Sequence, residues 1–250
     1  MASRISDFLL HPDSFFGKLA AGPDEYMTPL LIVGTCMVLD AVRQFLLADW
    51  MRQVILPLMP SVSGMPEIGS FISGMISILL FVSVVENIPA FIAYWLIITA
   101  VFTIVSQYFS QEGTIYKMII ATGWGMAPLI VYNAMVIPLF LSYRNAMSLT
   151  ISPEAFNQTS SRYSRGSSIQ SSFNRPDYSD YIHVNGAYVE FHQIEFVLFA
   201  LALLACCIFW VYGVRNIRNI SVLQAAVSVV LPVTVFLIGI LGIKIMNGWL

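Results

Sequence analysis

The sequence predicts an all-α polytopic membrane protein with about five transmembrane helices and a small extramembrane β-hairpin near residues 181–190. Of its 250 residues, 58% are hydrophobic and only 10% are charged, whereas soluble domains are about 45–50% apolar and about 25% charged. Because one membrane-spanning helix needs about 20 apolar residues, the length leaves room for about five spans and some polar sequence. The hairpin is predicted from the Asn185-Gly186 pair, which stands between two β-favouring runs.

Residues 1–27 are expected to form a cytoplasmic or interfacial segment ahead of a membrane domain that covers residues 28–250. Within this segment, residues 5–19 carry several large apolar side chains but are too short and too broken to span a bilayer. An interfacial segment fits this composition best, and a loop with chance aromatics is the alternative. The first 25 residues contain four acids and no apolar run of signal-peptide length, so we expect them to be retained.

The first predicted span covers residues 28–49 and is bracketed by Tyr26 and Trp50, which suit the membrane interface. The next stretch, 68–107, holds forty almost uninterrupted apolar residues, too many for one span and barely enough for two. Pro89 removes a backbone donor and disfavours helix at the preceding residue, so we expect a kink or a break there.

Residues 89–108 form a clear second span, whereas residues 68–85 have three interpretations. They are a separate span, a re-entrant segment or an interfacial continuation of the same helix. We favour continuation or re-entry, because a full extra span would move the N-terminus to the outside.

The third predicted span covers residues 114–142, with Pro128 near its middle. A polar loop, 143–190, follows it, and the serine-rich first part of this loop is flexible by composition. The fourth predicted span covers residues 194–212.

The start of the fifth helix is predicted by a capping box, in which Ser221 is followed three residues later by Gln224. We therefore expect this helix to begin at Ser221 and to run to about Met246.

The orientation follows from the basic residues in the short flanks, because long loops translocate largely regardless of charge. With five spans and the N-terminus inside, the inside flanks hold Arg4, Lys18, Lys117, Arg215 and Arg218. The short outside flanks hold Arg52, Arg144 and Lys244. This excess predicts a cytoplasmic N-terminus.

Composition and motifs exclude several function classes. The net charge of −2 provides no basic field for nucleic acid. The sequence has no zinc-protease, Walker or nucleophile-elbow motif, and its three histidines lack a second ligand at metal spacing. The three cysteines lie in apolar runs and suit small hydrophobic positions. We therefore expect no enzyme activity, no cofactor and no metal.

Three ionisable residues form a candidate intramembrane polar site. Asp40 and Arg43 lie three residues apart inside the first predicted span, so they share a helix face and can pair. Glu86 precedes the helix-breaking Pro89, and broken helices with nearby acids line some transport sites. The alternative is that Arg43 reaches the interface and neutralises Asp40 while Glu86 sits at the interface itself.

Arg215 and Arg218 lie in the short connection between the last two predicted spans. They are candidates for contact with anionic headgroups or with a cytoplasmic partner. As ordinary topology determinants they need neither contact.

Three segments give the chain its resemblance to the Yip1-domain family of polytopic membrane proteins. These segments are His11-Pro12-Asp13-Ser14-Phe15-Phe16, then Glu112-Gly113-Thr114-Ile115-Tyr116-Lys117 continuing through Gly123-Trp124-Gly125-Met126-Ala127-Pro128, and finally Trp210 to Ser221. Gly113, Tyr116, Lys117 and Pro128 match the family's Gly-x-x-Tyr-Lys stretch and its proline follow-on. The third segment is similar to the last loop of prokaryotic members.

The resemblance implies five spans, a cytoplasmic N-terminus and, in a prokaryote, residence in the plasma membrane. It implies a non-enzymatic scaffold or adaptor that acts through the lipid bilayer and a membrane or cytoplasmic protein partner. Eukaryotic relatives engage Rab GTPases in vesicle trafficking, but this sequence lacks a clear match to their acidic-aromatic-Gly-Pro motif. A small ion or solute transporter or channel using Asp40, Arg43 and Glu86 is the alternative function.

Overall fold

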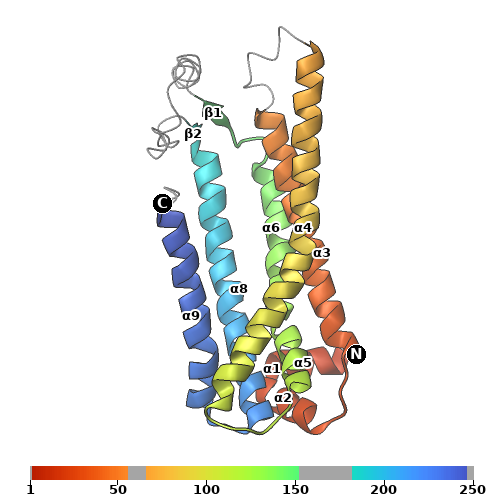
Figure 1. The fold of residues 1–250 in the computed structure, drawn as a ribbon, viewed down its shortest axis with the longest axis vertical. Helices are drawn as coiled ribbons and strands as arrows, with labels where there is room; N and C mark the ends of the chain where they lie inside the picture. The colour runs from red at the N-terminus through yellow and green to blue at the C-terminus, as the bar shows by residue number, and fades with distance from the viewer. Residues whose placement is uncertain (1, 56–65, 152–181, 247–250) are drawn as a thin grey trace, which may run out of the picture.

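A computed structural model of the chain describes residues 2–55, 66–151 and 182–246. It is a bundle of long helices, with short helices packed at one end and a two-stranded sheet at the other (Figure 1). In the described residues, five segments are long and apolar enough to cross a membrane, which agrees with the predicted count. These segments are Met27–Val54, Ile88–Gln107, Ile115–Tyr143, Gly186–Arg218 and Val222–Gly239.

The N-terminal segment forms two short helices, α1 (Ala2–Leu10) and α2 (Pro12–Ala21). Proline is favoured in the first turn of a helix because its missing N–H has no partner there anyway, and Pro12 opens α2. Phe15 and Phe16 on α2 and Phe8 on α1 are buried against the bundle. The two helices therefore lie against one end of the membrane domain (Figure 1).

Helix α3 (Met27–Ile55) contains the first span. Helix α4 (Pro66–Gln107) then runs for 42 residues with Pro89 inside it. Of the kink or break expected there, the break is absent, and the α4 ribbon changes direction about halfway along its length (Figure 1). Of the three interpretations of residues 68–85, the structure has continuation of the same helix.

The third span consists of two consecutive helices, α5 (Ile115–Gly125) and α6 (Ala127–Tyr143), which meet at Met126. At the junction, the N–H of Met126 bonds to the carbonyl of Gly123 at 3.2 Å, which is a tighter turn than an α-helix makes. Pro128, which cannot donate a backbone hydrogen bond, falls in the first turn of α6. The segment that sequence hydropathy treats as one unit is thus two units in the structure.

The predicted hairpin at residues 181–190 is wrong. Helix α8 (Gly186–Arg218) starts immediately after Asn185, whose side-chain oxygen accepts the N–H of Tyr188 at 3.1 Å as a helix N-cap. Asparagine suits caps and turns for the same reason, because its short side chain bonds to nearby backbone groups. The strand before it, β2 (Ile182–Val184), pairs antiparallel with β1 (Leu149–Ile151) across the polar loop.

Helix α9 (Val222–Met246) begins as the capping box predicts. Ser221 N–H donates to Oε1 of Gln224 at 3.0 Å, and Gln224 N–H donates to Oγ of Ser221 at 3.3 Å. Helix α8 ends at Arg218, and its C-cap Asn219, two residues before Ser221, takes the left-handed conformation with φ 52°. The turn between the last two spans is therefore fixed by local sequence.

Candidate functional site

Two groups of polar side chains stand out, and the first lies between α3, α6 and α8. Arg43 on α3 bonds through Nη2 to Oδ1 of Asp40 at 2.8 Å and through Nη1 to Oε1 of Glu195 on α8 at 2.5 Å. The side chains of Arg43, Asp40 and Glu195 are 22%, 22% and 17% exposed. Arg43 thus links two carboxylates from two spans.

Tyr132 and His192 complete this group, which we call the intramembrane cluster (Asp40, Arg43, Tyr132, His192 and Glu195). The Tyr132 hydroxyl on α6 accepts from Arg43 Nη1 at 3.2 Å and donates to Glu195 Oε1 at 3.3 Å. Nδ1 of His192 lies 3.0 Å from Oε2 of Glu195. Every polar group of the cluster is therefore connected to Glu195 either directly or through Arg43.

The cluster lies well inside the first span. At 1.5 Å per residue, Asp40 is about 20 Å along α3 from Met27, its first residue. Ionisable groups at such depth are costly unless they pair, and here two carboxylates share one guanidinium. Nε of Arg43 and Nε2 of His192 are buried and lack a hydrogen-bond partner within the described part of the chain.

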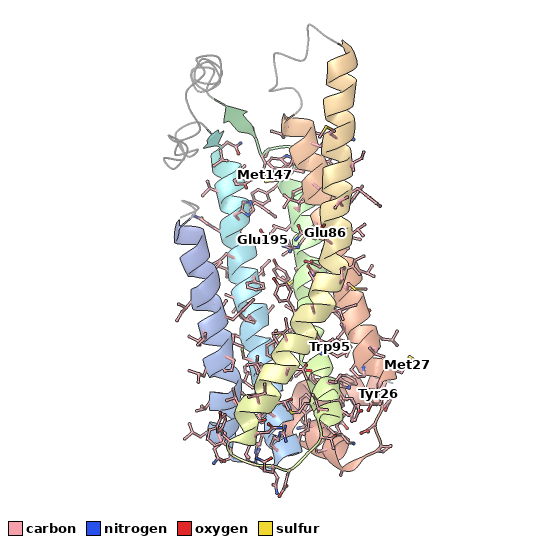
Figure 2. The ribbon with its side chains drawn as sticks, in the orientation of Figure 1. Tyr26, Met27, Glu86, Trp95, Met147 and Glu195 are labelled. Carbon is pink, nitrogen blue, oxygen red and sulfur yellow. The ribbon has the colours of Figure 1, made fainter. Side chains whose placement is uncertain are left out.

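Glu86 lies apart from these partners. It is exposed on α4 and makes no ion pair with the described residues, although Figure 2 shows it at about the height of Glu195. Asp40 and Arg43 face α6 and α8, whereas the opposite side of α3 faces α4 across a groove. The structure therefore brings Asp40 and Arg43 together and places Glu86 elsewhere.

The second group is formed by the three segments that resemble the family motifs, which meet at the end of the bundle that carries α1 and α2 (Figure 1). We call this meeting point the motif junction (residues 11–16, 112–128 and 210–221). Asp13 Oδ1 accepts from Nη1 of Arg215 at 2.7 Å and from Nδ2 of Asn216 at 2.9 Å. The Phe15 ring meets the Trp124 ring edge-on at 4.8 Å between centroids. Segments about 100 and 200 residues apart thus form one packed unit.

Lys117 holds the C-terminal end of α2. Its Nζ donates to the carbonyl oxygens of Leu19, at 3.1 Å, and Gly22, and pairs with Asp24 at 3.0 Å. A cation at a helix C-terminus bonds the free carbonyls and complements the helix dipole. Tyr116, its neighbour in the motif, is 58% exposed.

Gly113 is required by both backbone conformation and packing. Its φ of +75° lies in the left-handed region, and a Cβ there would overlap the carbonyl oxygen of Ile217. A similar close approach occurs deeper in the junction, where a Cβ on Gly125 would overlap the Trp210 indole. Trp210 Nε1 donates to the carbonyl of Thr122 at 3.0 Å.

Arg218 points into the protein and is only 2% exposed. It donates to Ser106 Oγ at 3.1 Å and to the carbonyl of Glu112 at 2.7 Å. The guanidinium therefore joins the end of α4 to the loop before α5, and it lies away from the headgroup surface suggested for it. Arg215 is 36% exposed and already paired with Asp13.

Sequence reasoning missed Tyr132, His192 and Glu195 as members of the cluster. Glu195 stands at the edge of the predicted fourth span, where an acid is ordinary. One signal for it exists, because His192 and Glu195 are three residues apart and share a helix face. Among the described residues, no group of three His, Cys, Asp or Glu side chains could hold a metal ion.

The fold and these two groups define a helical, multi-pass membrane protein. The family model described as the Yip1 domain matches residues 6–243, and the chain belongs to this family. An uncharacterised protein of Methanocaldococcus jannaschii is 28% identical over 136 residues, a match that covers 54% of this chain and 87% of the relative. No solved structure matches the chain.

Proposed function

We propose that this protein is a non-enzymatic membrane scaffold or adaptor that acts through partner proteins or lipids. The observation that carries the proposal is the motif junction, in which three distant segments assemble into one surface at one end of the bundle. The flanking charges favour placing this end, and with it the N-terminus, in the cytoplasm, at the plasma membrane of a prokaryotic cell.

Two properties of the junction support a recognition role. It is held at both ends of α2, by Asp13 with Arg215 and by Lys117 with the last carbonyls of the helix. Because α2 is already held in place, a partner that binds here loses less free energy to ordering the surface. Exposed side chains of different chemistry lie on or beside it: Tyr116 within the junction, and Leu10 and Lys18 next to it on α1 and α2.

A photocrosslinking amino acid at Tyr116, introduced into the full-length protein in its native membranes, tests this role. We expect one specific adduct, which is lost when Asp13→Ala loosens the junction. The matched control is the same crosslinker at Val131, which is 59% exposed on α6 and away from the junction. No adduct from Tyr116, together with measurable solute flux in proteoliposomes, would contradict the scaffold role.

The orientation is tested separately with a reporter enzyme fused to either terminus. With five spans and a cytoplasmic N-terminus, a C-terminal alkaline phosphatase fusion will be active outside the cytoplasm. An active N-terminal fusion would overturn the orientation without touching the scaffold role.

A small ion or solute transporter or channel is the second candidate, and the intramembrane cluster favours it. Charged residues within spans mark many solute pathways. The substitutions Asp40→Asn, Arg43→Gln and Glu86→Gln each test it by flux in proteoliposomes. Flux that all three leave unchanged would remove this candidate.

A further inference from the structure

The outer half of α4 presents a regular apolar stripe that no described part of the chain covers. The stripe consists of residues spaced alternately by three and four positions: Met75, Ile78, Val82, Val85, Pro89 and Ile92. Met75, Ile78, Val82, Val85 and Ile92 are 48%, 63%, 40%, 45% and 40% exposed, and Pro89 is also exposed. Spacing of this kind is the a and d pattern by which one helix packs along another.

This half of α4 differs from the half nearer the motif junction. Between Trp95 and Ser106, α4 buries one face, which includes Thr99 and Phe102, against its neighbours. Between Gly74 and Ile92, no described side chain is buried. The apolar pattern therefore continues beyond the point where the bundle uses it.

The bilayer is too thin to cover the whole of α4, but the stripe from Met75 to Ile92, about 26 Å long, is short enough to lie within it. A helix of 42 residues is about 63 Å long at 1.5 Å per residue, whereas the hydrocarbon layer is about 30 Å thick. Figure 1 shows the N-terminal end of α4 projecting past the ends of α3, α6, α8 and α9.

The two flanks of the stripe have different chemistry. On one side, a groove of about 300 Å³ between α3 and α4 is lined only by apolar residues: Met37, Val38, Ala41, Val42, Phe45 and Ile88. On the other side stands Glu86, one position after Val85 in the repeat. Positions next to an a and d seam are those where ion pairs select the partner helix.

From this arrangement we propose that the stripe on α4 docks an apolar helix of another membrane protein, which carries a lysine or arginine facing Glu86. Charge complementarity argues for a basic partner, because Glu86 makes no ion pair with the described residues. A second copy of α4 cannot supply the cation, since Pro66–Gln107 contains two glutamates and no basic residue. The proposal rests on the scaffold role and names the class of partner for a second surface.

The test uses synthetic helices in lipid nanodiscs that contain the full-length protein. One probe is a leucine-rich helix with an a and d repeat and a single lysine placed to face Glu86, and its matched control has glutamine there. Energy transfer between dye-labelled protein and probe measures association. We expect the lysine helix to bind at least tenfold more tightly than the glutamine helix.

Variants separate the parts of the proposal. Glu86→Gln should remove the preference for lysine, and Glu86→Lys should transfer it to a helix carrying glutamate. The pair Ile78→Ser and Val85→Ser should weaken both probes, whereas Leu201→Ser and Leu204→Ser, at positions each 59% exposed on α8, should weaken neither.

Equal binding of the two probes, or no binding of either, would overturn the proposal. Energy transfer between two copies of the protein that competes with the probe would assign the stripe to self-association instead. Because the probe reports on α4 alone, its failure is distinguishable from failure of the crosslink at Tyr116.

Discussion

Arg43 on α3 and Glu195 on α8 are joined at 2.5 Å although 152 residues separate them in the chain. The contact crosses the bundle and also takes in Tyr132 on α6. Three of the five candidate spans in the described residues thus share one polar contact. The contribution of this contact to stability depends on all of its members together. Removing one partner leaves a buried charge unpaired, and this destabilises the protein far more than replacing the whole group with apolar side chains.

We expect Arg43→Met to destabilise the protein by about 3–5 kcal/mol, since it leaves two carboxylates without their cation. Thermal unfolding in detergent, followed with a thiol-reactive dye that reaches the buried Cys36 and Cys206 only on unfolding, measures the change. Asp40→Leu combined with Arg43→Met and Glu195→Leu should recover most of the loss.

The matched control for Arg43 is Arg144→Met, which removes a more exposed pair with Asp49 at the end of the bundle away from α1 and α2. It should cost under about 1 kcal/mol, because partly exposed ion pairs contribute little. Equal losses of stability in Arg43→Met and Arg144→Met would mean that the intramembrane cluster stabilises the protein no more than a partly exposed ion pair does.

Gly113→Ala should destabilise the motif junction, because a non-glycine residue with positive φ costs about 1–2 kcal/mol before any overlap with Ile217 is counted. Gly74→Ala is the matched control, since its Cβ would meet nothing within 4 Å. Alanine is favoured over glycine inside a helix by about 1 kcal/mol. The two variants should therefore shift the unfolding temperature in opposite directions, and shifts of the same sign would contradict the described junction.

Lys117→Met should loosen the C-terminal end of α2, because the carbonyls of Leu19 and Gly22 lose their donor. Hydrogen exchange measured by mass spectrometry should rise in the peptide that covers residues 12–24 and stay unchanged in α9. Lys18→Met is the control, since the Lys18 side chain is 70% exposed. Unaltered exchange in Lys117→Met would contradict a role of Lys117 in holding the C-terminal end of α2.

Asn185→Ala should destabilise the start of α8 by about 1 kcal/mol, the usual cost of losing an N-cap. The cost should be larger than for an isolated cap, because Asn185 also bonds the backbone of Ser148 at 3.1 Å and Ala146 at 2.6 Å. Gly186→Ala should be harmless, since nothing lies within 4 Å of its Cβ position. A hairpin turn at this place would require the reverse order of sensitivity, and circular dichroism with thermal melts distinguishes the two.

Sequence predicted those parts of the fold that are decided locally or by hydropathy. Hydropathy identified the spans, because about 20 apolar residues have no other stable environment. Ser221 and Gln224 form their capping box within four residues, so pattern alone sufficed. The Asn185-Gly186 pair is an equally local signal, but it is compatible with both a hairpin turn and the start of a helix. The apolar sequence that follows it favours the helix.

The candidate sites were only partly accessible from sequence, because their partners come from distant segments. Asp40 and Arg43 are neighbours on one helix face, so their pairing could be predicted. Glu195 and Tyr132 depend on how α3, α6 and α8 pack, which no local pattern reports. Sequence analysis placed Arg218 in a loop. In the structure α8 extends as far as Arg218, so the side chain is buried in the bundle and backbone carbonyls accept its hydrogen bonds.

The described residues form two apolar cores, and the boundary between them falls within α6. Most of α5 belongs to the apolar core that contains Trp124 and Trp210, whereas Tyr132 and Val136 on α6 belong to a separate core with Trp50. Because no described residue belongs to both cores, losses from well-separated substitutions in different cores should add independently. The core next to the motif junction can then keep its packing while the other core changes its side chains.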